Sequence, residues 1–167
     1  MVRPRPIATA LTIAALVCLS ASVALAQGSA TATMAVSIEV TPNCTVAAGS
    51  LAFGTVTAAQ APAQTANAAI EVACGPNVAF TVELDDGQNG VGGTRRARDP
   101  ATGQSIGYEI FADPAHTRRW GSLKTQSVAG VTASSGMERL TAYGRIENAG
   151  SVAGGAYGDL VTVTTHF

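Results

Sequence analysis

The chain has 167 residues and a formal net charge of −1, and 13% of its residues are charged. This length fits one ordinary domain, and the near-neutral balance excludes a strongly basic footprint for nucleic acid. The chain is rich in Gly, Thr and Val and poor in Lys and Glu, a composition that favours short strands and turns over helices.

The first 26 residues have the pattern of a secretory signal peptide. Two arginines stand near the start, an apolar run covers Ile7–Leu25, and small residues precede a cleavage site after Ala26. A retained membrane anchor is the alternative, because the run is about long enough to span a bilayer. Its Thr and Ser content and the cleavage site favour the signal. We therefore expect residues 1–26 to be removed on export.

The next segment, Ala30–Thr41, alternates apolar and polar residues. Its apolar side chains occupy the even positions Ala30, Ala32, Met34, Val36, Ile38 and Val40. Because successive side chains of a strand point to opposite faces, the pattern predicts a strand that is apolar on one side. Pro42-Asn43 ends it without a tight turn that would supply a neighbouring strand. We expect its partner to be another copy of the same chain.

Two cysteines, Cys44 and Cys74, remain once Cys18 leaves with the signal. An even pair in an exported protein favours a disulfide between them. Together with His116 and His166 they do not have the spacing of zinc ligands. We expect a Cys44–Cys74 disulfide, no metal and no cofactor.

Several further stretches have the alternation of strands, separated by turn residues. They are Asn43–Val46, Ile70–Cys74, Phe80–Leu84, Ile106–Ile110, Leu140–Ile146 and Tyr157–Phe167. Ala58–Asn67, Asp85–Asp99 and the polar stretch through Gly136 are expected as connections. Phe80, Val82, Leu84 and Cys74 are expected to face the core. No segment after residue 26 has a convincing helical period, so the pattern predicts an all-β sandwich.

The predicted last strand, Tyr157–Phe167, runs to the last residue and places Val161, Val163 and Phe167 on one side. Nothing follows that would pair with its edge. A sandwich that stops there would expose apolar surface and an open ladder, which isolated proteins normally avoid. One end of the chain therefore has a spare strand and the other lacks one.

Charged clusters suggest two further activities, and for each we favour the simpler interpretation. Asp85-Asp86 provides paired carboxylates of the kind used in glycoside hydrolysis, but neighbouring carboxylates at a strand end point apart, so we expect no enzyme. A group of arginines offers a site for an acidic polysaccharide or a neighbouring subunit, but we expect solvated loop charge. These arginines are Arg95, Arg96, Arg98, Arg118 and Arg119. Trp120 is expected to pack, and His166 to lie on an outer face.

Taken in order, short motifs along the chain resemble one known family. They are Asn43-Cys44-Thr45-Val46, Leu51-Ala52-Phe53-Gly54, Cys74, Phe80-Thr81-Val82-Glu83-Leu84-Asp85-Asp86-Gly87, Ile106-Gly107-Tyr108-Glu109-Ile110-Phe111 with Asp113, Tyr143-Gly144-Arg145-Ile146, and Gly155-Ala156-Tyr157-Gly158-Asp159 before the terminal strand. The set resembles the spore-coat-protein-U-like domain of major pilins in archaic chaperone–usher pili of the Csu type. The resemblance covers residues 27–41, as an N-terminal donor strand, and residues 42–167, as the folded domain.

The resemblance implies an incomplete immunoglobulin-like sandwich that is completed by donor-strand exchange. A PapD-like periplasmic chaperone lends a strand, and at an outer-membrane usher the N-terminal strand of the next subunit replaces it. Carried onto this chain, the donor side chains are Ala30, Ala32, Met34, Val36 and Ile38. Val161, Val163 and Phe167 would form the acceptor groove and contact the chaperone. Thr165 and the small alanines depart from the pattern and predict a shallower fit at one end.

The expected function is therefore that of a structural pilin, exported through the periplasm and polymerised into cell-surface fimbriae for adhesion and biofilm formation. Its expected partners are neighbouring copies of the chain, the chaperone and the usher, with no nucleic acid. The alternative is a self-complemented secreted binding module, or a pilus-tip adhesin, that uses the arginine-rich loops.

Overall fold

The computed structural model describes residues 28–57, 59–61, 64–149 and 151–167. The chain divides into two units, the first ending at Ile38 and the second comprising Glu39–Phe167. The predicted signal peptide lies outside the described residues. Over the described ranges, no helix has the length and apolar character needed to cross a bilayer.

In the first unit, residues 28–38 contain no strand. The side chains of Met34, Val36 and Ile38 are 88%, 76% and 83% exposed. A strand is stable only where a second strand completes its hydrogen-bond ladder. The strand predicted over Ala30–Thr41 therefore stays a prediction that requires a partner.

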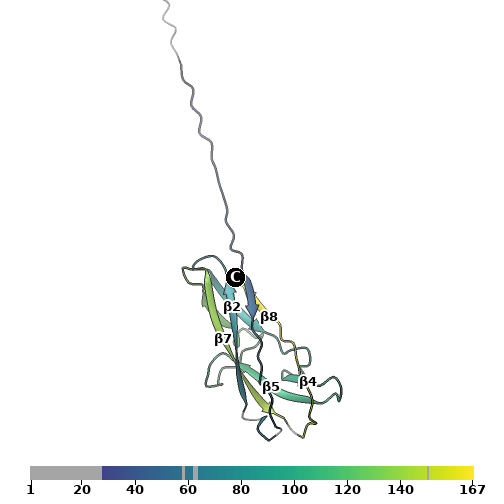
Figure 1. Ribbon diagram of the computed structural model, residues 1–167. Helices are drawn as coiled ribbons and strands as arrows, with labels where there is room; N and C mark the ends of the chain where they lie inside the picture. Colours follow the sequence, from purple (N-terminus) through teal and green to yellow (C-terminus); the bar gives the residue numbers. More distant parts are fainter. Residues whose placement is uncertain (1–27, 58, 62–63, 150) are drawn as a thin grey trace, which may run out of the picture. The chain divides into compact units, whose positions relative to one another are not determined.

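The second unit is a sandwich of two antiparallel sheets, which confirms the predicted all-β, immunoglobulin-like fold (Figure 1). One sheet has the strand order β1-β2-β7-β5-β4 and the other β6-β3-β8. The strands are β1 (Thr45–Ala48), β2 (Thr65–Ala73), β3 (Ala79–Leu84), β4 (Arg95–Arg98), β5 (Ser105–Phe111), β6 (Val128–Val131), β7 (Met137–Asn148) and β8 (Val163–His166).

The core lies between the sheets and is built from the alternating side chains of the strands. Phe80, Val82 and Leu84 are 3%, 0% and 1% exposed, as predicted. Trp120 is buried at the centre, and its indole N–H donates to the carbonyl of Val82 at 3.0 Å. The predicted packing role of this tryptophan is therefore confirmed. Its one polar group, the indole N–H, also has a hydrogen-bond partner inside the core.

Three predicted connections are wrong in part, because they contain strand residues. β2 begins at Thr65, inside the expected Ala58–Asn67 connection. β4 lies at the end of the expected Asp85–Asp99 loop and pairs with β5. β6 lies in the polar stretch before Gly136 and pairs with β3. β4 and β6 are short, and they carry Arg, Gly or Ala at positions where larger apolar side chains would indicate a strand. Pairing with an established neighbour outweighs such weak local preference.

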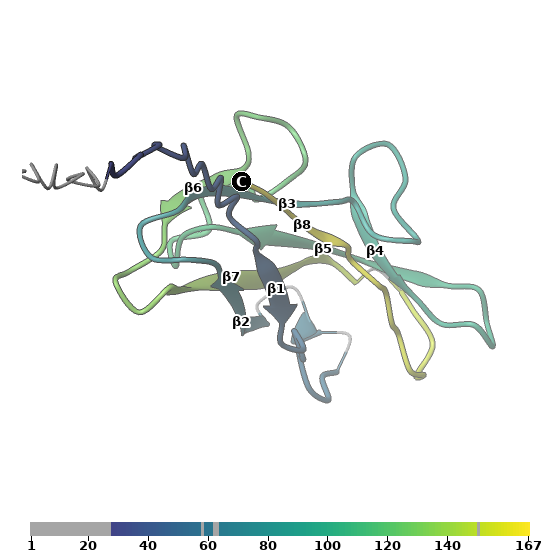
Figure 2. The same ribbon diagram turned by 90° about the horizontal axis from the view of Figure 1, so that it is seen from above.

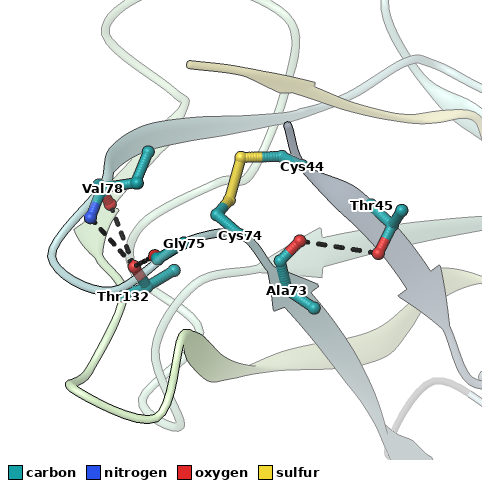
Figure 3. Close-up of a disulfide and its surroundings, with 7 residues drawn as sticks. All are labelled: Cys44, Thr45, Ala73, Cys74, Gly75, Val78 and Thr132. Atoms are coloured by element: carbon teal, nitrogen blue, oxygen red, sulfur yellow. Dashed lines mark hydrogen bonds between the residues drawn. A yellow bond between two sulfur atoms is a disulfide. The ribbon is translucent and has the colours of Figure 1, made fainter. Parts of the chain in front are cut away.

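The predicted disulfide is confirmed: Cys44 and Cys74 are joined, 30 residues apart in sequence (Figure 3). It connects the start of β1 to the end of β2. Beside it, the buried hydroxyl of Thr132 donates to the carbonyl of Gly75 at 2.7 Å and accepts from the amide of Val78 at 3.0 Å. Closing a loop of this length stabilises the fold by about 3–4 kcal/mol in the chain-entropy model.

Candidate functional site: a groove between β1 and β8

The candidate site lies where the outer strands of the two sheets face each other. Among the described residues, β1 pairs with β2 alone and β8 pairs with β3 alone. β1 and β8 lie side by side in Figures 1 and 2. They belong to different sheets, and no ladder joins them. One side of the sandwich is thus open along its length.

The space between these strands, which we call the main hollow, has a volume of about 610 Å³. One wall contains Ala48 and Leu51, and the other contains Val161 and Val163. The floor is formed by core side chains, among them Ile70, Leu84 and Ile110. Because the hollow opens directly onto the core, an apolar strand placed in it would complete the packing of the domain.

A second space, the distal hollow, continues the groove and also has a volume of about 610 Å³. Its lining includes Val56, Ile106, Ile146 and Tyr157. Phe53 and Tyr108 line both hollows, and their rings pack edge to face with centroids 6.2 Å apart. The two spaces therefore form one groove that aromatic side chains divide.

The two walls of the groove run in opposite directions. Residues 48–51 share the main hollow with residues 160, 161 and 163. Farther along the chain, residues 53–57 share the distal hollow with residues 152–157. A strand in the groove is consequently parallel to one wall and antiparallel to the other.

The wall that leads into β8 has one backbone edge occupied and one free. Gly158 exchanges two backbone hydrogen bonds with Arg98, at 2.9 and 3.1 Å. The carbonyls of Leu160 and Thr162 accept from the amides of Gln88 and Asp85 at 3.0 and 3.1 Å. In an extended chain, the backbone N–H and C=O groups of successive residues point to alternate sides. The backbone groups of the two residues that lie between Gly158, Leu160 and Thr162 therefore point toward the groove.

The free edge consists of the backbone groups of Asp159 and Val161. Among the described residues, neither one makes a backbone hydrogen bond. An exposed row of N–H and C=O groups is a template for pairing with another strand. This edge and the apolar floor together can bind an extended, amphipathic segment.

Of the predicted groove residues, Val161 and Val163 line the main hollow. Phe167 is 57% exposed and lines a separate shallow space beside Phe80 and Gly130, so its place in an acceptor groove stays a prediction. The Thr165 side chain follows the inward alternation of β8, and its buried hydroxyl has no hydrogen-bond partner among the described residues.

Sequence reasoning did not identify Leu51, Phe53 or Asp159 as groove residues. Leu51 and Phe53 lie in an irregular segment after β1, where no alternation shows which way a side chain points. Asp159 lines the main hollow although it is charged, and only its place in a motif drew attention to it. A groove wall outside regular strands leaves no periodic signal.

The expected solvation of the arginines is wrong for Arg95 and Arg119. Arg95 is 0% exposed, forms a salt bridge with Glu109, and donates to the carbonyls of Leu84 and Trp120 at 3.1 and 2.8 Å. Arg119 pairs with Glu109 at 2.6 Å and with Asp86 at 2.8 Å. Both guanidinium groups are thus used inside the domain.

The paired carboxylates of Asp85 and Asp86 serve different structural contacts. Asp85 accepts from the amides of Gly87 and Thr162, both at 2.9 Å. Burial alone would raise the pKa of Asp85, but these hydrogen bonds and the nearby Arg95 charge lower it below its ordinary value. Asp86 pairs with Arg119. Over the described ranges, no group of three or more His, Cys, Asp or Glu side chains is placed to hold a metal.

Comparison with known proteins gives a family match and a structural match. The family model described as Spore Coat Protein U domain matches residues 30–164. No curated protein sequence matches the chain. A similar fold occurs in the crystal structure of the CsuC-CsuE chaperone-tip adhesion subunit pre-assembly complex from archaic chaperone-usher Csu pili of Acinetobacter baumannii, with 21% identity and a TM-score of 0.57. The match covers 77% of this chain and 40% of that chain, so this chain spans less than half of the structure it resembles.

Proposed function

Because the chain belongs to the Spore Coat Protein U domain family, we propose that it is a structural subunit of a chaperone–usher pilus. In this proposal, Ala30–Ile38 of one copy fills the groove between β1 and β8 of another. The observation that carries it is a groove that opens onto the core beside a free backbone edge.

The apolar face of the N-terminal segment has the chemistry that the groove requires. Met34, Val36 and Ile38 are exposed, and most of the side chains that line the main hollow are apolar. Burying each of these three side chains contributes about 1.5–3 kcal/mol. Backbone pairing with the free edge adds hydrogen bonds along the same length. A slip of one residue would turn the polar face inward, so the register is fixed.

Chain geometry favours completion by another copy over self-completion. All strand pairs of both sheets are antiparallel, and a donor antiparallel to β8 would end near Tyr157. Tyr157 lies where the main hollow meets the distal hollow, whereas Cys44, just before β1, is anchored by its disulfide at the other end of the main hollow. That separation is about 30 Å at ~3.3 Å per residue. Residues 39–43 extend over at most about 18 Å.

Such a contact is head-to-tail, because each copy donates its own segment and accepts one from a neighbour. Contacts of this kind generate filaments when the rotation between successive copies does not close a ring. We infer that the filament is a surface fimbrium, with a periplasmic chaperone and an outer-membrane usher as assembly partners. The similar structure supports the chaperone, because it is a complex of a chaperone with a pilus subunit.

The experiment removes the donor segment and follows assembly. Deleting residues 30–38 should abolish fibres seen by electron microscopy while leaving chaperone binding intact, since the groove is unchanged. In the matched control, Thr33→Asn with Ser37→Asn changes the polar face of the same segment and should preserve fibres. Intact fibres from the deletion variant would refute the proposed function.

The alternative of a binding module that uses arginine-rich loops has less support. Arg95 and Arg119 are engaged with Glu109 inside the domain. Arg96, Arg98 and Arg118 are the exposed members of the set. We therefore propose no ligand for these loops and no enzymatic role for the acidic pair.

A further inference from the structure

The groove wall that leads into β8 is irregular and is held in place by its neighbours. Residues 159–162 belong to no strand. Besides the backbone bonds that Gly158, Leu160 and Thr162 make, this wall has one carboxylate, that of Asp159, a residue that lines the main hollow. Its contacts show how the position of the wall is fixed.

Asp159 connects three parts of the domain. One of its oxygens, Oδ1, accepts from the backbone amide and the side-chain amide of Asn89, both at 3.0 Å. The other, Oδ2, accepts from the hydroxyl of Tyr108 at 2.8 Å. Tyr108 lies on β5 of the five-stranded sheet, whereas residues 158–162 continue into β8 of the opposite sheet. The carboxylate therefore ties the wall to both the Asn89 loop and the far sheet.

The surroundings are shaped for this carboxylate. A Cβ atom on Gly87 would lie 2.0 Å from Asp159 Oδ2, and Gly87 has a φ of +80°. Only glycine combines that backbone conformation with so close an approach. Burial and the Asp159 carboxylate raise the pKa of Tyr108, so its hydroxyl stays protonated and continues to donate.

We propose that Asp159 is a positioning residue for strand uptake: it holds residues 157–162 at the spacing at which the backbone groups of Asp159 and Val161 form an ordered edge. This inference rests on the proposed function, because the edge matters only if a strand is bound there. Tyr108 lines both hollows, so the same hydrogen bond also fixes the division of the groove.

The test measures exchange of the bound segment. The full chain, assembled with itself, is mixed with an excess of a fluorescently labelled peptide of residues 28–41, and the rate of peptide incorporation is followed. Asp159→Ala should accelerate exchange by about tenfold or more, the effect of losing hydrogen bonds to a charged group. Tyr108→Phe should accelerate it less, and the double variant should be no faster than Asp159→Ala, because the two groups act through one contact.

The matched control is Asp113→Ala. Asp113 also accepts several hydrogen bonds, from Thr117 at 2.9 Å and from Arg118 at 2.6 Å, but it does not line the groove. It should change the unfolding temperature without changing the exchange rate more than about twofold. Equal exchange rates in Asp159→Ala and the wild type, or equal acceleration by Asp113→Ala, would overturn the role of Asp159. A wild-type chain that incorporates none of the peptide when it is refolded from denaturant with the peptide in excess, so that the groove is empty at the start, would instead refute the proposed function.

Discussion

Arg95 is a buried cation whose partners come from three segments of the domain. Its guanidinium pairs with Glu109 and donates to the carbonyls of Leu84, Asp85 and Trp120. The side chain is 0% exposed. A charge in this position is tolerable only because every nitrogen of the guanidinium donates to an acceptor. Arg95 therefore closes the end of the core at the point where β3 leaves its sheet.

We predict that Arg95→Met destabilises the domain by about 3–5 kcal/mol, because it leaves buried carbonyls and a carboxylate without their donor. Equilibrium denaturation in urea measures this change. The control is Arg96→Met on the same strand, where the side chain is exposed and the change should stay within about 0.5 kcal/mol. Equal losses in the two variants would contradict the assignment.

The sequence does not reveal such a residue. Arg95, Arg96 and Arg98 are neighbours of the same type, and nothing in their order distinguishes the buried one from the exposed ones. The difference arises from Glu109 and Trp120, which lie far along the chain and meet Arg95 only after the sheets pack. Buried apolar positions such as Val82 are predictable, because their alternation is a local property.

Among the elements, the end of β3 and the wall before β8 are joined by Asp85. Its carboxylate accepts from the amides of Gly87 and Thr162, and its own amide donates to the Thr162 carbonyl. The tight turn after β3 and the groove wall thus share one charged acceptor. Since hydrogen bonds to the ionised form lower the pKa of Asp85, folding favours the carboxylate over the acid.

This direction sets the pH dependence of stability. The folded pKa lies below the unfolded value of about 3.9, so the stabilisation is present above that pH and is lost as pH falls through the folded pKa. We predict that Asp85→Asn lowers stability by about 1 kcal/mol at pH 7. The gap to wild type should narrow as the pH falls below the unfolded pKa of about 3.9 and through the lower folded pKa. Thermal unfolding of both proteins across this range measures it, and a gap that is constant with pH would disprove the assignment.

Elements are predictable to the extent that their own residues alternate. β3 and β5 have inward-facing apolar residues at every second position, and both are predicted correctly. β4 and β6 are edge strands of four residues each, and their sequences do not distinguish a strand from a loop. The groove lies between two further edge strands, β1 and β8. It exists because no ladder joins them, and the absence of a pairing leaves no pattern in the sequence.

At the scale of the whole molecule, the sequence predicts an unpaired strand near the N-terminus and a missing strand beside the predicted last one. The two predictions make sense only when both ends of the chain are considered together. The alternation of Met34, Val36 and Ile38 and the inward positions of Val161 and Val163 are visible in the sequence. The irregular wall with Phe53 and Asp159, and the opposite directions of the two walls, are visible only in the structure. These directions decide how a donor segment can reach the groove.

This geometry yields a prediction about connectivity. A second copy of residues 28–41, appended after Phe167 through a short Asn-Gly-type turn, would run antiparallel to β8 as the next strand of a hairpin. It would enter the groove of its own chain, which the N-terminal copy does not reach in that direction. We expect this variant to be a stable monomer in sedimentation experiments, with the native N-terminal segment left free.

The control appends the same segment with Ser at the positions of Met34, Val36 and Ile38. Without the apolar face, the hairpin loses about 1.5–3 kcal/mol for each side chain. The groove should then stay available to the N-terminal segments of other copies, and filaments should form. If both appended variants assemble like the wild type, the groove between β1 and β8 is not the surface that holds the copies together.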